Sequence, residues 1–175
     1  AWIRERRMSA FAAYGAIEAL PMPCVALVHG AVVGSGVEIA AACDFIVATP
    51  DATFRTPEAQ RGTVGATQRL PRILGKRLAK DMMFTGRALT APEARDAGLV
   101  SRIGALDAEK RANAEVVLKA PPLALKLAKR TIDRGVELDP ARTLVRIPED
   151  HVLPPGGLHI GWSNYPLQVE ARLFP

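Results

Sequence analysis

The 175 residues of the chain suit one domain of ordinary size, since domains contain about 150 residues. Apolar residues make up 49% of the sequence and charged residues 23%, which excludes wholesale disorder and predicts a packed core. The net charge of +5 would suit an anionic ligand. Aromatic residues are only 5%, however, and no run of five like charges occurs, so nucleic acid is a disfavoured partner.

The two cysteines, Cys24 and Cys43, lack the CxxC spacing of metal and redox motifs. We interpret them as reduced core thiols of a cytoplasmic protein, with a bridge between them as the alternative. The charged N-terminal residues contain no signal-peptide core, and no stretch approaches the roughly 18 apolar residues of a membrane span. No membrane partner is therefore expected. Because the chain begins at Ala1, we expect a fragment or a trimmed protein.

The first predicted element is a helix at 2–19, where apolar residues recur among good helix formers until Pro21 ends the pattern. The apolar run VALVHG predicts a buried strand at 25–30, and a glycine-rich turn leads into a helix at about 36–42. DFIVAT predicts another strand at 44–49. This order predicts a right-handed βαβ crossover and a sheet that is at least partly parallel.

Shorter elements follow. Residues 53–55 indicate a brief strand, and Thr56-Pro57-Glu58 indicates a turn or helix start, where proline suits the first helical position. A helical pattern covers 66–84 and breaks at Leu74-Gly75.

The rest of the pattern is helical before it becomes irregular. Thr90 and Glu93 predict a capping box at the start of a helix that Gly98 ends, with a strand after it. Two amphipathic helices are predicted at 106–119 and 121–135. From Pro148 onward, five prolines and three glycines in 28 residues predict an irregular tail.

The stretch HGAVVGSGVEIAAACD at 29–44 leads from glycines and a serine to a carboxylate among small apolar residues. A nucleophile elbow would need glycine at Val33 and Val37, and a dinucleotide fingerprint would need glycine at Ile39. A phosphate loop would need a lysine after the glycines. The histidines His29, His151 and His159 have no metal-like spacing, so no metal site is expected.

Two glutamates are the candidate catalytic residues, because a half-buried carboxylate is costly unless it has a partner or a role. Glu38 has a structural alternative, since Ser35-Gly36-Val37-Glu38 fits a capping box with Ser35 at the N-cap. Glu58 has one as well, because TPEA resembles the later APEA, where Glu93 is a first-turn acid stabilised by the helix dipole. Spacing alone leaves both alternatives open.

A family resemblance favours the catalytic interpretation. The stretches HGAVVGSGVEIAAACDFIVATPDATFRTPEAQRGT and TQRLPRILGKRLAKDMMFTGRALTAPEARDAGLVSRI resemble the crotonase superfamily of enoyl-CoA hydratases and isomerases. The glycine turn with its glutamate, the ACD strand start, the PE pair, TQRL, TGR and EARDAGLV occur in family order. The resemblance is continuous from about residue 23 to 103 and looser to 135.

The resemblance implies a lyase of fatty-acid metabolism that adds water to a 2-enoyl-CoA thioester. Glu38 and Glu58 would hold the water and move its protons, which requires a base at oxygen and an acid at the α-carbon. The backbone N–H of Ser35 would help to hold the thioester oxygen. No cofactor is implied, because coenzyme A arrives as part of the acyl-CoA substrate.

The implied fold is α/β, with a crotonase-like core of repeated ββα units, truncated at its N-terminus and followed by helices. Residues 1–140 would be a partial crotonase domain and 141–175 an irregular tail rich in proline and glycine. Relatives of this kind form trimers or hexamers, so a homo-oligomer is expected.

The sequence also departs from the family pattern. The alanine-glycine-aspartate loop that would supply a second oxyanion donor is not present, the loop before TQRL is about three residues shorter, and the family's last helices are not recognisable after about 140. We therefore expect the chain by itself to be nearly inactive and to self-associate through an uncovered strand edge. The alternative function is a non-catalytic protein that binds acyl-CoA, protein partners or RNA.

Overall fold

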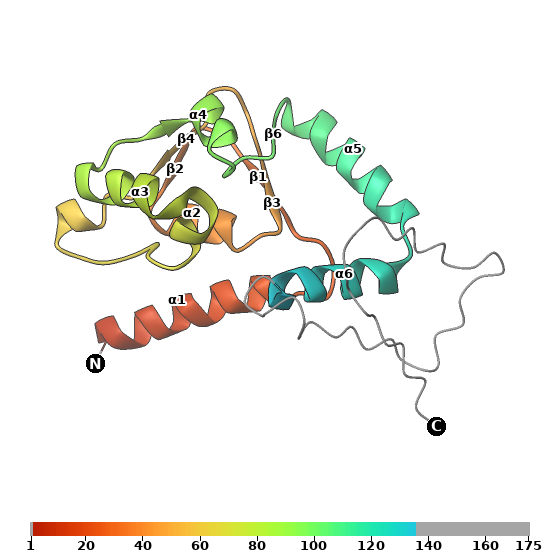
Figure 1. The fold of residues 1–175 in the computed structure, drawn as a ribbon, viewed down its shortest axis with the longest axis horizontal. Helices are drawn as coiled ribbons and strands as arrows, with labels where there is room; N and C mark the ends of the chain where they lie inside the picture. Colours follow the sequence, from red (N-terminus) through yellow and green to blue (C-terminus); the bar gives the residue numbers. More distant parts are fainter. Residues whose placement is uncertain (1, 136–175) are drawn as a thin grey trace, which may run out of the picture. The chain divides into compact units, whose positions relative to one another are not determined.

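A computed structural model describes residues 2–135 of the chain. The chain divides into two compact units, Ala1–Pro122 and Leu123–Pro175. Helix α6 (Pro122–Gly135) begins at the last residue of the first unit, and the rest of it is the described part of the second unit. The irregular tail predicted after residue 147 lies outside the described residues, so the account of the fold below is that of the first unit (Figure 1).

The first unit contains helices and short strands in alternation. Its helices are α1 (Trp2–Glu18), α2 (Ser35–Ala41), α3 (Arg69–Thr85), α4 (Ala91–Asp96) and α5 (Leu106–Lys119), with a single 3-10 turn η1 (Ala59–Arg61). Its strands are β1 (Val25–Val28), β2 (Ala31–Val33), β3 (Phe45–Ala48), β4 (Thr53–Arg55), β5 (Leu89–Thr90) and β6 (Arg102–Ile103).

The strands form two small sheets. One has the order β1-β3-β6 and is parallel throughout. The other has the order β2-β4-β5, with a parallel β2–β4 pair and an antiparallel β4–β5 pair. Consecutive strands therefore enter different sheets before α2 and α3, with β1 and β2 before α2 and β3 and β4 before α3. This arrangement confirms the predicted α/β fold with a ββα-repeat core.

The local predictions were accurate for most elements and wrong at two places. The strand predicted at 25–30 ends at Val28, because the chain turns at His29-Gly30, and a separate strand that was not predicted, β2, begins at Ala31. The helix predicted from residue 66 begins at Arg69, since Ala66 adopts a positive φ of 55°, which no helix accommodates. The predicted break at Gly75 is confirmed by its non-helical φ of 72°.

The predicted capping box of α4 is also confirmed. The Thr90 hydroxyl accepts the Glu93 N–H, and the Glu93 carboxylate accepts the Thr90 N–H at 2.8 Å. The backbone N–H groups of Thr90 and Glu93, which have no acceptor within the helix, are thus satisfied by local side chains. Glu93 here has a purely structural role, which makes it a useful reference for the candidate catalytic acids.

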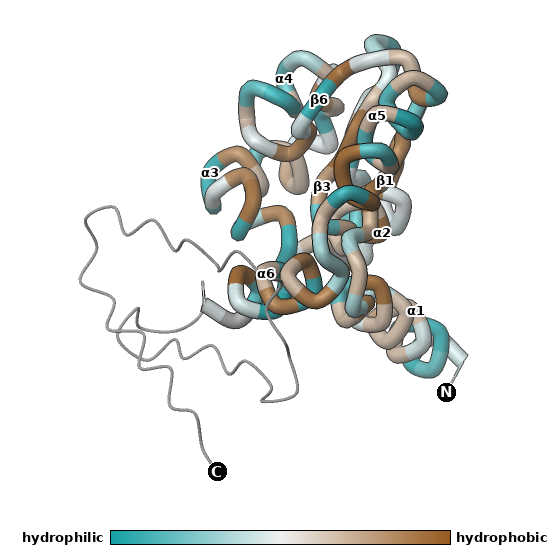
Figure 2. Tube along the Cα trace, turned by 90° about the vertical axis from the view of Figure 1, so that its right-hand side faces the viewer, coloured by the Kyte–Doolittle hydropathy of each residue, from teal (hydrophilic) through white to brown (hydrophobic). Residues whose placement is uncertain are grey.

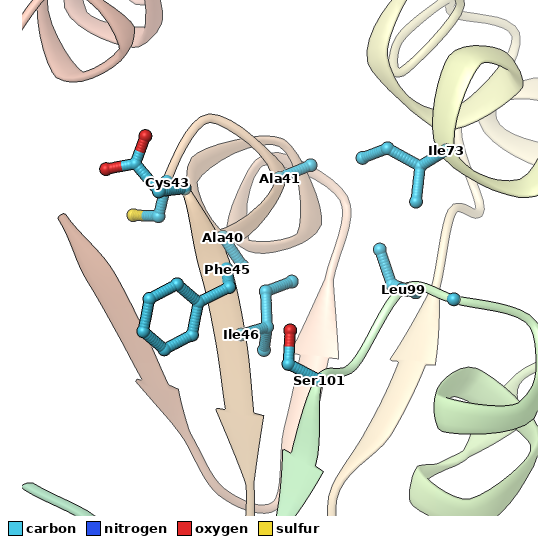
Figure 3. A pocket seen from close by; sticks show the side chains of 10 residues that line it. Ala40, Ala41, Cys43, Phe45, Ile46, Ile73, Leu99 and Ser101 are labelled. Atoms are coloured by element: carbon cyan, nitrogen blue, oxygen red, sulfur yellow. The ribbon is translucent and has the colours of Figure 1, made fainter. Parts of the chain in front are cut away.

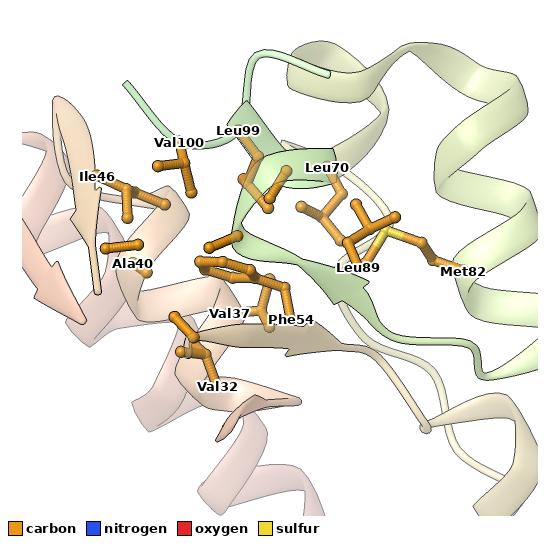
Figure 4. Packing of buried hydrophobic residues seen from close by; sticks show 14 of the residues in the cluster. Val32, Val37, Ala40, Ile46, Phe54, Leu70, Met82, Leu89, Leu99 and Val100 are labelled. Atoms are coloured by element: carbon orange, nitrogen blue, oxygen red, sulfur yellow. The ribbon is translucent and has the colours of Figure 1, made fainter. Parts of the chain in front are cut away.

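The core is formed by the second sheet, by β3 of the first sheet and by helices α2, α3 and α4. Phe54 of β4 is fully buried and packs among Val37, Leu70 and Leu89, as Figure 4 shows. The first sheet is apolar as well, with hydrophobic colours along β1 and β3 in Figure 2. The core therefore fixes both the helix that carries Glu38 and the strand that precedes Glu58.

Strand β1 is an edge of its sheet, with β3 as its strand neighbour among the described residues. All four of its side chains are half-buried. Within residues 2–135, no helix combines the length and the apolar character that crossing a membrane would require.

Candidate active site

The start of α2 is built by a tight turn at Gly34. This glycine has φ 58° and ψ −117°, and its N–H donates to Arg55 O at 2.9 Å, which ties the turn to β4. Ser35 is the first helical residue, where a backbone N–H has no acceptor within the helix. Gly34 is the N-cap and no side chain caps it, so the capping-box interpretation of Ser35 and Glu38 is wrong.

Glu38 lies one turn into α2 and is 6% exposed. Its Oε1 accepts a hydrogen bond from the backbone N–H of Ala66, and its Oε2 lies 3.4 Å from Arg69 Nη1. The carboxylate therefore has a charged partner and a backbone donor, as a buried carboxylate requires. Both partners come from the segment before and at the start of α3, not from its own helix.

Arg69 connects Glu38 to helix α1. Its guanidinium donates to both carboxylate oxygens of Glu18, at 2.6 and 2.8 Å, and lies 5.4 Å from the ring centroid of Tyr14. The hydrogen bonds to Glu18 raise the pKa of Arg69 above its ordinary value, so this side chain is cationic throughout the pH range of a folded protein. Sequence reasoning did not single out Arg69, although it stands in the TQRL motif that carried part of the resemblance.

Glu58 is the N-cap residue of η1, but its side chain makes no capping hydrogen bond. Its carboxylate lies instead against two glycines. A Cβ atom at Gly34 would be 2.9 Å from Glu58 Oε1, and a Cβ atom at Gly65 would be 3.1 Å from Glu58 Cγ. Glu58 Oε2 is buried and has no hydrogen-bond partner among the described residues. Glu58 thus differs from Glu93, whose carboxylate accepts a hydrogen bond from the N-cap residue of its own helix.

The two carboxylates contact consecutive residues of one loop. Glu38 accepts the Ala66 N–H, and Glu58 packs on Gly65, the residue before it. Glu58 also packs on Gly34, which directly precedes Ser35. The structure therefore brings Ser35, Glu38 and Glu58 to the junction of the α2 start, the end of β4 and the loop at 62–68. Two carboxylates can move protons, and backbone N–H groups at a helix start can stabilise a developing negative charge.

No group of three or more His, Cys, Asp or Glu side chains in the described part of the chain is arranged to hold a metal ion. The expected absence of a metal site stays a prediction, and His151 and His159 lie outside the described residues.

The turn at Gly34 yields a test of this geometry. We expect Gly34→Ala to lower the free energy of unfolding by about 1–3 kcal/mol, because an L-residue is strained at this φ and its Cβ would press on Glu58. Gly36→Ala is the matched control. A Cβ there meets only Val32 Cγ1 at 3.6 Å, and alanine favours the helix by roughly 0.5–1 kcal/mol. Urea unfolding of both variants provides the measurement, and equal midpoints would contradict the assigned turn.

Comparison with known proteins shows which family the chain resembles. A family model described as enoyl-CoA hydratase/isomerase matches residues 4–150. The human protein named enoyl-CoA hydratase domain-containing protein 2, mitochondrial, is 43% identical over 133 residues, which cover 70% of this chain and 46% of that protein. The Arabidopsis thaliana protein named probable enoyl-CoA hydratase 2, mitochondrial, is 40% identical over 134 residues, covering 73% and 44%.

Solved structures agree with this match. The crystal structure of enoyl-CoA hydratase from Bacillus anthracis superposes with a TM-score of 0.76 at 32% identity, covering 79% of this chain and 56% of that one. The chain thus spans about half the length of the relatives it matches. From the family model, the identity to these relatives and the shared fold, the chain belongs to the enoyl-CoA hydratase/isomerase family of the crotonase superfamily.

Proposed function

We propose that this chain carries the acid–base part of a site that adds water to a short or medium 2-enoyl-CoA. The observation that supports it most is the convergence of Glu38 and Glu58 on Gly65-Ala66, two consecutive loop residues beside the start of α2. The two side chains come from different ββα units, so local secondary structure does not explain why they converge. Relatives that are named enoyl-CoA hydratases are consistent with this chemistry.

The proposed reaction needs one base and one acid. One glutamate takes a proton from water while the water oxygen bonds to the β-carbon of the enoyl group, and the other glutamate gives a proton to the α-carbon. Negative charge grows on the thioester oxygen in between. The backbone N–H of Ser35, at the start of α2, is the proposed donor to that oxygen. Coenzyme A enters as part of the substrate, and no separate cofactor takes part.

The buried Oε2 of Glu58 fits this role. A buried oxygen without a protein partner is costly unless another group satisfies it. In the proposed site that group is the reacting water, which Glu38 and Glu58 share. Arg69 then acts indirectly, by holding the Glu38 carboxylate through the contact at 3.4 Å.

Hydration assays test the proposal directly. We expect this chain by itself to hydrate a short 2-enoyl-CoA about 100- to 1,000-fold more slowly than a chimera with the part of the Bacillus anthracis hydratase that it does not cover. The reason is that the second oxyanion donor implied by the family resemblance would come from that part. Loss of the enoyl absorbance measures the rate, and titration calorimetry with a saturated acyl-CoA measures binding.

The outcomes separate the candidate functions. Binding of the saturated acyl-CoA without turnover by the chimera would support the non-catalytic alternative instead. Turnover of the chain alone at the rate of the chimera would show that one hydrogen-bond donor to the thioester oxygen is enough. Absence of both binding and turnover in a folded chimera would contradict the proposal altogether.

We also propose that the chain forms a homo-oligomer. Among residues 2–135, β1 pairs with a strand on one side only, and this free edge with its half-buried apolar side chains favours association. Size-exclusion chromatography with light scattering is expected to show a species larger than 18.8 kDa, the mass of one chain. A monodisperse monomer at working concentration would refute this.

The cytoplasmic location stays a prediction. Several relatives are named mitochondrial, whereas others are bacterial proteins, so the comparisons do not favour one compartment.

A further inference from the structure

A pair of thiols lies at the end of α2 opposite to Ser35. Cys24 directly precedes β1, and Cys43 follows Ala41, the last residue of α2, by two positions. Their sulfur atoms are 3.6 Å apart, with the Cys24 S–H donating to Cys43 Sγ. The Cys43 S–H donates in turn to Ile39 O at 3.5 Å.

Backbone contacts fix this proximity. The Asp44 N–H donates to Cys24 O at 2.8 Å, and the Cys24 N–H donates to Asp44 Oδ2 at 2.6 Å. These bonds extend the parallel pairing of β1 and β3, in which Val25 lies opposite Phe45. The sulfur atoms are therefore neighbours because the sheet has formed, although 19 positions separate them in the sequence.

Both thiols are accessible to small molecules. Each cysteine is only half-buried. Cys43 also lines a pocket of about 110 Å³ together with Phe45, Ile46 and Ile73. In Figure 3 its sulfur points away from Ile73. Because neither cysteine is fully buried, we expect a low-molecular-weight disulfide to reach this pair without unfolding of the sheet.

We propose that Cys24 and Cys43 are a site of reversible oxidation, at which an intramolecular disulfide closes the crossover from β1 to α2. An S–S bond is about 2.05 Å long, so the sulfur atoms, now 3.6 Å apart, need to approach by about 1.5 Å. The closed segment contains Ser35 and Glu38. The bridge therefore anchors the far end of the helix that carries the proposed site.

Oxidised glutathione is the oxidant in this scheme. The thiolate of one cysteine attacks a glutathione sulfur, one glutathione leaves as thiolate, and a mixed disulfide remains. The thiolate of the second cysteine attacks the bound sulfur of the first and releases the other glutathione. The two protons lost by the cysteines are taken up by the two glutathione thiolates, so one disulfide is reduced for each one formed.

The experiment is a redox titration of the whole chain against mixtures of oxidised and reduced glutathione, followed by acid quenching, alkylation of remaining thiols and mass spectrometry. We expect a peptide pair linked through Cys24 and Cys43 and a chain mass lower by two hydrogen atoms. Addition of dithiothreitol is expected to return the whole sample to the reduced form. In strong urea the bridge is expected to need at least about tenfold more oxidised glutathione, because the folded sheet raises the effective concentration of the thiols.

Serine variants provide the controls. Cys24→Ser and Cys43→Ser are each expected to take up one glutathione at the remaining cysteine and to form no internal bridge. If Cys43→Ser does not fold, Cys24→Ser alone supplies the comparison. The bridged wild-type chain is also expected to unfold at a higher urea concentration than its reduced form, with no such shift in Cys24→Ser.

Three results would overturn the proposal. These are equal titration midpoints in native buffer and in urea, glutathione adducts or cross-linked dimers in place of the internal bridge, and a bridged chain that unfolds at lower urea concentration than the reduced one. None of these readouts depends on hydratase activity, so the thiol pair and the proposed function are tested separately.

Discussion

Glu38→Gln and Glu58→Gln are each expected to lower kcat for hydration of a short 2-enoyl-CoA by about 100-fold or more, because an amide cannot take up or release the proton that the reaction moves. The substitutions keep the size of the side chains, so the packing of residue 58 against Gly65 and Gly34 is retained. The measurement uses the chimera with the Bacillus anthracis hydratase, in which the reference rate is expected to be high enough for a 100-fold loss to be seen.

Glu93→Gln is the matched control for this pair. Glu93 caps α4 through Thr90 and contacts Arg87, and it has no place in the proposed site. Its substitution is expected to leave the hydration rate unchanged. A rate near that of the unsubstituted chimera for Glu38→Gln or Glu58→Gln would remove that residue from the acid–base pair. An equal loss in all three variants would point to a general loss of folding.

Phe54→Ala is expected to destabilise the fold by about 3–5 kcal/mol, the cost of deleting a large buried aromatic side chain. Phe54 is fully buried at the centre of the core, and β4, which carries it, joins β2 to β5. Since a domain of this kind is stable by about 5–15 kcal/mol, the loss is a large share of the total. Urea unfolding followed by circular dichroism measures the effect.

Phe84→Ala is the matched control, because Phe84 is 71% exposed near the end of α3. Its unfolding free energy is expected to change by no more than about 0.5 kcal/mol, as for most surface substitutions. Equal unfolding midpoints for Phe54→Ala and Phe84→Ala would contradict the core described here.

The candidate acids could be located in the sequence, but their surroundings could not. Resemblance selected Ser35, Glu38 and Glu58, while spacing alone left a capping box as an alternative for Glu38. The structure decided against that alternative, because Gly34 occupies the N-cap and the Glu38 carboxylate reaches Ala66 and Arg69. These partners lie 28 and 31 positions away in the chain, beyond any local pattern.

The sequence by itself determined the elements whose causes are local and the family to which the chain belongs. The capping box of Thr90 and Glu93, the break of α3 at Gly75 and the bounds of α5 each depend on residues a few positions apart. Only the tertiary structure decided how the strands divide between two sheets. Strands β2 and β5 are too short to show a hydrophobic alternation in the sequence.

The same limit applies to the contacts that link distant residues. The ion pair of Arg69 with Glu18 joins positions 51 apart, and the Cys24 and Cys43 sulfur atoms meet only because β1 and β3 pair in parallel. Periodicity and capping act within a helical turn or a strand, whereas these contacts depend on register between elements. Register is set by how the apolar faces pack together, and that packing exists only once the chain has folded.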